Sequence, residues 1–152
     1  MNEVIYIVTD GSAIGNPGPG GWAAVFSQGK KSLDLSGANS WTTISEMELV
    51  AAVQALRTIR SRGKIELSSD SEYLIHGMRF HLHRWQAEGW TNRRGRRLQH
   101  QDLWEELLRL NGQLNIHWKW VRGHNQHPAQ SRADSLAYRE ARTLWSKLRI
   151  AA

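Results

Sequence analysis

The chain has 152 residues, enough for one domain with a buried core, and its 40% hydrophobic and 22% charged residues are typical of a soluble globular protein. It contains no Cys, which excludes disulfides, thiolate catalysis and Cys-type zinc sites and is compatible with a reducing cytoplasm. Lys and Arg outnumber Asp and Glu by 20 to 14, and the resulting net charge of +6 favours a polyanionic partner.

Strand-like patterns occur near the start of the chain, in its middle and before its last predicted helix. They are rich in β-branched and aromatic residues, and two of them end in an aspartate, Asp10 and Asp70. The first apolar run, "VIYIV", is far too short for a signal peptide or a membrane span. A hairpin is predicted to fold around Gly29. The predicted strands comprise residues 3–11, the two halves of 21–38, 64–70 and 114–121.

Helical patterns occupy most of the remaining chain. The first helix carries Leu49, Val53 and Leu56 on one apolar stripe and is predicted to stop at Gly63. The order of elements implies an α/β fold in which an antiparallel start joins parallel strands, with helices on both faces. No repeat or linker interrupts the pattern, so we expect residues 1–152 to form a single domain. The predicted helices comprise residues 43–62, 71–80, 81–90, 101–110 and 131–150, and the predicted loops 92–97 and 122–130.

Four carboxylates are predicted to converge at one edge of the sheet. Asp10 and Asp70 each follow a strand, and the carboxyl ends of parallel strands are where open α/β sheets place their sites. Glu48 lies in the first turn of the connecting helix, and Asp134 is expected to open the last helix. Any one of them alone is more often a turn or helix-start residue. Four together would repel one another and raise their pKa values unless a cation were present.

Hard oxygen ligands in this number suit Mg²⁺ or Mn²⁺. Two such ions about 4 Å apart could activate a water and stabilise the leaving oxygen of a phosphodiester. The stretch "TTISEMEL" leaves the role of Glu48 open, because Thr43 with Glu46 and Ser45 with Glu48 both have the spacing of a capping box. Glu48 is therefore either a helix cap or a metal ligand.

Several motifs together resemble those of one enzyme family. The chain contains "IVTDGSAIGNPGPGGWAAV", "MELVAAVQAL", "LSSDSEYLIHGM", "VRGHNQHP" and "RADSLA", and in this combination it resembles ribonuclease HI of the bacterial type from Val4 to Trp145. The resemblance implies the ribonuclease H-like fold, a five-stranded mixed sheet with helices on both faces. It also implies Mg²⁺-dependent endonucleolytic cleavage of the RNA strand of RNA–DNA hybrids, leaving 5′-phosphate products. We expect a cytoplasmic monomer with no membrane partner.

The resemblance also assigns roles to individual residues. Asp10, Glu48, Asp70 and Asp134 stand where the family keeps its metal-binding acids. His124, in the loop "GHNQHP", matches the family's mobile histidine, which implies a role in proton transfer or product release. A histidine in a loop is otherwise more often a solvated side chain. His127 would take this role only if the loop were registered differently.

A basic segment lies between the predicted helices in the middle of the chain. It is either a solvated loop on two core aromatics or a clamp on phosphates with a strong salt dependence, and its match to the family's basic protrusion favours the clamp. The two tryptophans either pack the protrusion or contact a sugar. The segment, called the arm below, contains Arg84, Trp85, Trp90, Arg93, Arg94, Arg96 and Arg97.

The chain departs from the family where the substrate would be read. The family carries two asparagines and then Arg or Gln before "MEL", where this chain has Ile44, Ser45 and Glu46. Those asparagines read the minor groove, where 2′-hydroxyls distinguish RNA from DNA. Glu72 replaces a neutral residue, and Trp41 takes a position that can carry a basic one. The polar candidates that remain for substrate contacts are Asn16, Thr42 and Thr43.

These departures leave two alternatives to a hybrid-specific ribonuclease. One is a nuclease of the same fold with altered specificity, acting on double-stranded RNA or junctions. The other is a non-catalytic module that binds RNA–DNA hybrids. The four acids argue against the second, because clustered negative charge beside phosphates contributes nothing to binding alone.

Overall fold

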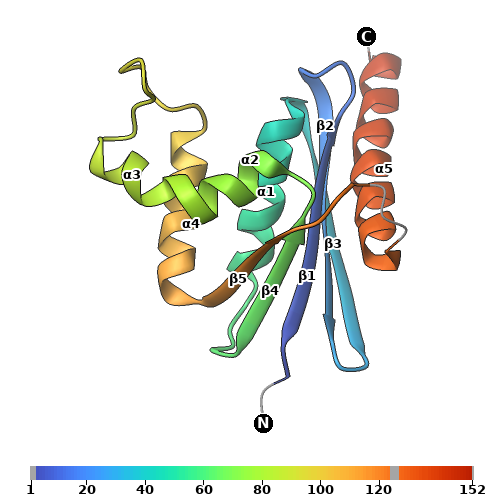
Figure 1. Cartoon of the computed structure of the whole chain (residues 1–152). Helices are drawn as coiled ribbons and strands as arrows, with labels where there is room; N and C mark the ends of the chain where they lie inside the picture. The colour runs from blue at the N-terminus through green and yellow to red at the C-terminus, as the bar shows by residue number, and fades with distance from the viewer. Residues whose placement is uncertain (1–2, 124–126, 152) are drawn as a thin grey trace.

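The structure is a computed structural model that describes residues 3–123 and 127–151. A five-stranded mixed sheet with the strand order β3-β2-β1-β4-β5 forms its centre (Figure 1). Neighbouring strands pair antiparallel from β1 to β3, whereas β4 pairs in parallel with both β1 and β5. The predicted fold class and sheet are confirmed. The strands are Ile5–Ala13 (β1), Gly18–Gln28 (β2), Lys31–Thr42 (β3), Lys64–Ser69 (β4) and Asn115–Trp120 (β5).

Helices cover both faces of this sheet. The pair α1 and α4 lies on one face and the long α5 packs on the other, against β1, β2 and β3 (Figure 1). No helix in the part of the chain that the structure describes is long and apolar enough to cross a membrane. The helices are Ile44–Arg57 (α1), Glu72–His76 (α2), the π-helix Gly77–His81 (η1), Leu82–Ala87 (α3), Gln101–Gln113 (α4) and Pro128–Ala151 (α5).

The central strand β1 contributes to two hydrophobic cores. Ile7 points into the larger core, which β1 shares with α1 and α4, and Val8 points into the smaller core beneath α5. From Ile7 to Asp10 the strand is buried on both faces, which explains the consecutive apolar residues there, whereas Tyr6 in the run "VIYIV" is 47% exposed. On α5, the small residues Ala133, Ala137 and Ala141 are fully buried and allow the helix to lie close to the sheet.

Two predicted helix boundaries are wrong. The first helix ends at Arg57 and not at Gly63, because the Thr58 hydroxyl donates a hydrogen bond of 2.7 Å to the carbonyl oxygen of Ala55 and closes the last turn. Side-chain bonds of this kind compete with helix continuation. The last helix begins at Pro128, a residue suited to the first helical turn because it has no N–H to leave unpaired.

The early start of α5 changes the position of Asp134. This residue lies in the second turn of α5 and does not open the helix as predicted. The strand β1 also continues past Asp10 to Ala13 because it remains paired with β2 over this stretch. Asp10 therefore projects from within a strand that is fixed on both sides, while Asp70 directly follows the last residue of β4.

Candidate active site

Three carboxylates meet at the strand edge. Asp10, Glu48 and Asp70 each contribute one carboxylate oxygen to a group of three atoms that lie within 4.8 Å of one another. In the parallel register of β1 and β4, Val8 is level with Ser68, so two residues further along each strand Asp10 and Asp70 are also level. Glu48 reaches the same point from the start of α1. The structure thus brings together three of the four predicted metal-binding acids.

Gly11 allows α1 to approach β1 at this point. A Cβ atom on Gly11 would lie 2.6 Å from the backbone nitrogen of Glu48 and 2.7 Å from the carbonyl carbon of Met47. Both distances are far shorter than a non-bonded contact allows, so a larger residue would push the two elements apart. The N–H of Gly11 also donates a hydrogen bond of 2.9 Å to Oδ1 of Asp10. One glycine therefore sets the separation between the Asp10 and Glu48 side chains.

The start of α1 is held by residues other than Glu48. Thr43 is the N-cap, and its Oγ1 accepts a hydrogen bond of 3.1 Å from the N–H of Glu46. The N–H of Ile44 donates to Oδ1 of Asn16 at 2.9 Å, and the Thr42 hydroxyl donates to the Glu46 carboxylate. Of the two capping pairs that the sequence allows, the structure therefore contains Thr43 with Glu46. None of these cap hydrogen bonds involves the carboxylate of Glu48.

The acidic cluster carries unfavourable charge. Asp10 and Glu48 are each only 5% exposed. The pKa of the Asp10 carboxyl is raised to about 7, mainly by burial; the hydrogen bond with Glu48 opposes the rise, and the nearby Asp70 and Asp134 carboxyls add to it. Burial also raises the pKa of Glu48 well above its usual range, and the charge of Asp10 adds to the effect. Buried acids with raised pKa values are typical of sites that hold a cation.

One oxygen of the cluster has no partner among the described residues. Oε2 of Glu48 is buried and accepts no hydrogen bond. A buried carboxylate oxygen without a donor costs free energy that a bound cation would remove. Three carboxylates in one cleft are the hard ligands that Mg²⁺ and Mn²⁺ prefer, so the residues present fit a divalent cation.

Asp134 completes the rim of the same cleft. The cleft has a volume of about 340 Å³. The exposed carboxyl of Asp134 lies outside the tight group of three, but it is close enough to raise the pKa of Asp10. Ile44 and Ser45, which replace the family's asparagines, also line this cleft. The lining residues are Asp10, Gly11, Ile44, Ser45, Glu48, Asp70, Ser71 and Asp134.

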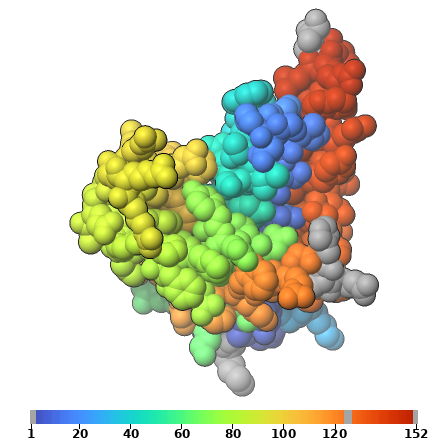
Figure 2. All heavy atoms as spheres, turned by 45° about the horizontal axis from the view of Figure 1, so that its top comes forward, coloured from blue at the N-terminus to red at the C-terminus, as the bar shows by residue number. Residues whose placement is uncertain are grey.

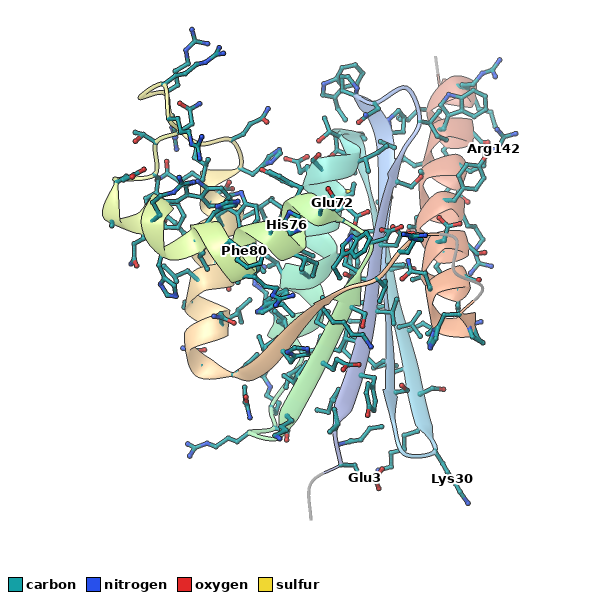
Figure 3. All side chains as sticks on the ribbon, in the orientation of Figure 1. Glu3, Lys30, Glu72, His76, Phe80 and Arg142 are labelled. Carbon is teal, nitrogen blue, oxygen red and sulfur yellow. The ribbon has the colours of Figure 1, made fainter. Side chains whose placement is uncertain are left out.

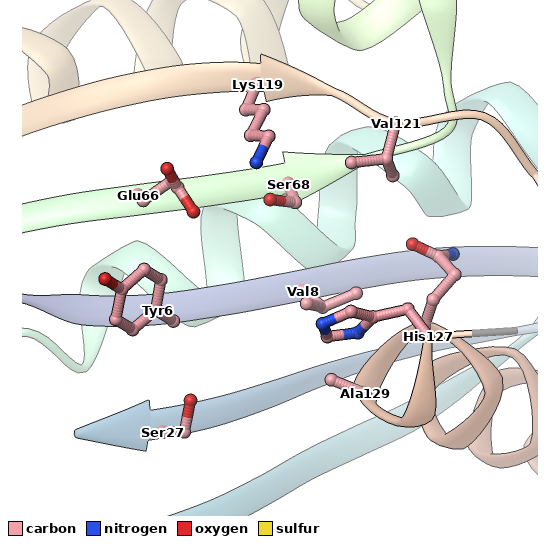
Figure 4. A pocket seen from close by; sticks show the side chains of 10 residues that line it. Tyr6, Val8, Ser27, Glu66, Ser68, Lys119, Val121, His127 and Ala129 are labelled. Carbon is pink, nitrogen blue, oxygen red and sulfur yellow. The ribbon is translucent and has the colours of Figure 1, made fainter. Parts of the chain in front are cut away.

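A second hollow lies on the sheet face beneath the start of α5 (Figure 4). It has a volume of about 350 Å³, and Lys119 and His127 line it together with the hydroxyl-bearing Ser68. Glu66 is the one carboxylate among its lining residues. A single carboxylate beside a lysine does not offer the several anionic oxygens that a hard divalent cation needs. The acidic cleft is therefore the better metal site.

The predicted polar contact residues have structural partners. Asn16, which is exposed, and Thr43 both hold the start of α1, and Thr42 is only 3% exposed. Their contacts with a substrate stay predictions.

Two departures from the family pattern lie on the surface. Trp41 is 69% exposed near the end of β3. Glu72 opens α2 and shares the surface of α2 and η1 with His76 and Phe80 (Figure 3).

The arm folds as a small hairpin on an aromatic base. Trp85 packs edge-to-face on the buried Trp104, with 5.0 Å between ring centroids, and Trp90 packs against the same core. At the tip, Oδ1 of Asn92 accepts hydrogen bonds from the backbone N–H groups of Arg94 and Arg96, at 2.9 and 3.0 Å. The structure thus gives both tryptophans packing contacts within the protein. The arginines exposed on this hairpin are Arg93, Arg94, Arg96 and Arg97.

His124 falls outside the described residues 3–123 and 127–151, and its assigned role stays a prediction.

Two residues that support Asp70 were not foreseen from the sequence. The indole N–H of Trp120 donates to the carbonyl oxygen of Asp70 at 3.2 Å, and a Cβ on Gly123 would lie 3.0 Å from Oδ2 of Asp70. The pairing of the predicted strands 64–70 and 114–121 could have indicated Trp120, because their ends meet.

Fold and site together define an α/β protein with an acidic cleft suited to a divalent cation. The sequence model of the RNase H family matches residues 2–142. The chain belongs to the RNase H family.

Curated relatives from bacteria match most of the chain. It is 43% identical over 137 residues to a ribonuclease H of Nitrosococcus oceani, with 90% of this chain and 93% of that protein covered. It is 44% identical over 138 residues to a ribonuclease H of Moorella thermoacetica, with 90% of each chain covered. A ribonuclease HI of Neisseria meningitidis is 38% identical over 141 residues, covering 93% of this chain and 97% of that protein.

Solved structures confirm the fold. LC9-RNase H1, described as a type 1 RNase H with the type 2 active-site motif, superimposes with a TM-score of 0.84 at 25% identity, covering 95% of this chain and 74% of that one. LC11-RNase H1, solved in complex with an RNA/DNA hybrid, gives a TM-score of 0.72 at 20% identity, covering 91% of this chain and 97% of that one. At this identity the second match concerns the fold alone.

Proposed function

We propose that this chain is an endonuclease that hydrolyses the RNA strand of RNA–DNA hybrids and leaves 5′-phosphate products, with residues 1–152 acting as a single ribonuclease H domain. The observation that carries the proposal is the group of carboxylates from Asp10, Glu48 and Asp70 within 4.8 Å, in a cleft at the ends of β1 and β4. Family membership and the ribonuclease H names of the curated relatives support the hybrid as substrate.

Asp10, Glu48 and Asp70 would hold Mg²⁺, with Mn²⁺ as a possible substitute, and Asp134 would add a ligand from α5. Two bound ions about 4 Å apart would supply the positive charge that lowers the pKa of an attacking water and stabilises the leaving oxygen of the phosphodiester. The protein's part is to fix the carboxylates. β1 and β4 hold the two aspartates level, and Gly11 lets α1 place Glu48 beside them.

The raised pKa values of Asp10 and Glu48 imply that the pair retains a proton near neutral pH until a cation takes its place. Glu48 is the better holder of that proton, because its Oε2 is buried without a donor. Loss of the proton would leave both carboxylates free to act as ligands. His124 is proposed to assist proton transfer or product release at the edge of this site.

Substrate contacts are proposed on both sides of the cleft. Arg93, Arg94, Arg96 and Arg97 would contact phosphates from the arm, and Trp85 and Trp90 would hold the arm in place through their packing. Asn16, Thr42 and Thr43 would support the substrate side of the cleft through the start of α1, which they stabilise.

A nuclease of altered specificity is the second candidate. Ile44 and Ser45 line the cleft in place of the family's two asparagines, and Ile44 has no hydrogen-bonding group to offer a base edge or a 2′-hydroxyl. A non-catalytic hybrid-binding module fits less well, because the acidic cluster would repel phosphates in the absence of a cation.

Cleavage of four substrates tests the proposal. Hybrid, duplex RNA, duplex DNA and single strands are incubated with the protein in Mg²⁺ or Mn²⁺, and Asp10→Asn serves as the inactive control. We expect cleavage of the RNA strand in the hybrid only, with products that carry a 5′-phosphate. Preferential cleavage of duplex RNA would support the second candidate, and metal-independent or absent cleavage would contradict the proposal.

A further inference from the structure

The C-terminal part of α5 projects from the molecule. Figure 2 shows this part (red) and the arm (yellow) on opposite sides of the surface made by the start of α1 and the β1–β2 turn. From residue 141 to the end of the chain there is no Asp or Glu, while Arg142, Lys147 and Arg149 carry positive charge. The helix that contributes Asp134 to the cleft therefore continues as a basic projection.

The residues of this projection are arranged in one stripe with Asp134. The spacings from Asp134 are 4, 8, 11 and 15 residues, which at 3.6 residues per turn place all members on the same side of a helix. The side next to this stripe is the buried one, with Ala133, Ala137 and Ala141 against the sheet. The α5 stripe comprises Asp134, Tyr138, Arg142, Trp145 and Arg149.

The outer end of the α5 stripe is pre-organised for anions. The guanidinium carbon of Arg142 lies 5.0 Å from the ring centroid of Trp145, and that of Arg149 lies 4.5 Å from the same centroid. A guanidinium stacked on an aromatic ring keeps its N–H donors available to a phosphate and loses less freedom on binding. No acidic residue described in the structure forms an ion pair with either arginine. Figure 3 shows Arg142 on the projecting part of α5.

Two cations beside one ring repel each other, and a bound polyanion would remove this repulsion. Resting on the proposed function, we infer that the α5 stripe binds the phosphate backbone of the RNA–DNA hybrid where the substrate leaves the acidic cleft. At about 1.5 Å per residue the stripe extends about 22 Å from Asp134 to Arg149. This length corresponds to about six base pairs at about 3.4 Å each, so the contact reaches well beyond the scissile bond.

Part of this surface lies beyond the residues that the family model matches. The family match ends at residue 142, and Trp145 and Arg149 lie beyond it. Together with the arm, the α5 stripe would provide positive charge on both flanks of a cleft that is itself acidic. A duplex seated over the cleft would then be held on both sides, and the repulsion between its phosphates and the carboxylates would be offset.

A matched pair of double variants tests the inference. Arg142→Gln with Arg149→Gln removes two charges from the stripe. Arg139→Gln with Lys147→Gln removes two charges from the same helix, at positions that the helical period places on other sides. Two hybrids are compared, one of about 20 base pairs and one of about 6, and their binding is measured by fluorescence anisotropy in metal-free buffer over a range of salt concentrations. At about 3.4 Å per base pair, only the longer hybrid can extend past Arg149 when it is bound over the cleft.

The stripe variant should raise the Kd of the long hybrid about tenfold and reduce its salt slope by about 2, while the short hybrid changes little. The control variant should change the Kd of either hybrid by less than about twofold, because the charges it removes do not face the duplex. Equal effects of the two variants, or no effect of either, would overturn the inference. So would a wild-type dimer that dissociates in the stripe variant, since the surface would then join copies of the chain. Wild-type protein that neither binds nor cleaves hybrid would contradict the proposed function as well.

Discussion

The acidic cleft and the basic arm are built in opposite ways. In the cleft, Asp10 and Glu48 are almost completely buried, and both come from regular elements that pack on each other through Gly11. In the arm, four arginines are exposed on a hairpin whose own shape depends on the Asn92 side chain. The cleft concentrates like charges at high free-energy cost, and the arm spreads like charges in water at almost none.

Each region is suited to a different task. Burial fixes position and raises pKa values, which suits groups that must hold a cation in one place. Exposure leaves every charge ionised and movable, which suits contacts with a phosphate backbone whose strength depends on salt. Changes to the buried carboxylates should therefore alter turnover in large steps, and changes in the arm should alter affinity in small, nearly additive ones.

Removing a ligand carboxylate is expected to have the largest effect. Asp10→Asn or Asp70→Asn keeps the side-chain shape but removes a negative charge from the cluster, so kcat with Mg²⁺ should fall by about 10³-fold or more. The folded state should survive, and the metal-free variant should be more stable because the repulsion is reduced. Steady-state cleavage and circular dichroism measure the two effects. Near-wild-type cleavage by either variant would remove that aspartate from the site.

Displacing α1 without touching a carboxylate should have the next largest effect. A Cβ in Gly11→Ala would overlap the backbone of Met47 and Glu48, so stability should fall by about 1–3 kcal/mol and kcat by about 10²-fold. Gly112→Ala is the matched control, since nothing lies within 4 Å of a Cβ at that helical position. The control should gain about 0.5–1 kcal/mol and keep its activity. Similar behaviour of the two variants in urea unfolding and cleavage would contradict the role given to Gly11.

Neutralising the arm should change affinity more than turnover. Replacing Arg93, Arg94, Arg96 and Arg97 with Gln is expected to raise KM about tenfold and to reduce the salt slope by up to about 4, because each phosphate contact contributes about 0.9. The control removes four exposed charges at the other end of the molecule, Lys30, Lys31, Arg60 and Arg62. An unchanged salt slope in the arm variant would make the arm a solvated loop.

The smallest effect is expected at the cleft wall. Ile44→Asn with Ser45→Asn places amide side chains, the groups found in the family, at two positions that line the cleft. A gained contact is worth about 0.5–1.5 kcal/mol, so KM for the hybrid should fall a few-fold and selectivity over duplex RNA should rise. If neither quantity improves, backbone groups or other residues already read the substrate, and the departures from the family pattern carry little weight.

The sequence predicts the parts of the site that depend on position along a strand. Asp10 and Asp70 follow apolar runs, so their place at one sheet edge could be inferred before the structure. The position of Asp134 within its helix could not, because Pro128 starts α5 three residues earlier than the polar loop pattern suggested. The end of α1 also depends on one residue, because the Thr58 side chain closes the helix before the glycine stop signal at Gly63.

The remaining features depend on contacts between distant segments. The need for Gly11 arises from the distance between β1 and α1, and no local pattern reports that distance. Asn16 bonds Ile44, 28 residues away, which a substrate-binding reading of its polar side chain did not anticipate. Trp85 and Trp90 could be interpreted either way from spacing, and only the position of Trp104 shows that they have packing partners.

Whether the buried carboxylates form a cation site can be measured through the free energy of unfolding as a function of pH, with and without Mg²⁺. Burial raises the pKa of Asp10 from 3.8 to about 7, so between these values the native state holds a proton that the unfolded chain has lost. The free energy of unfolding of the metal-free protein should therefore fall as the pH rises through this window, by up to about 4 kcal/mol.

Urea unfolding at pH 5 and pH 8 in chelator and in Mg²⁺ gives the required values. Mg²⁺ should restore the stability of the wild type at pH 8 and have little effect at pH 5, where it must displace protons. It should not stabilise Asp10→Asn at either pH. A pH-independent stability of the metal-free wild type, or equal stabilisation of wild type and Asp10→Asn by Mg²⁺, would contradict the proposed cation site.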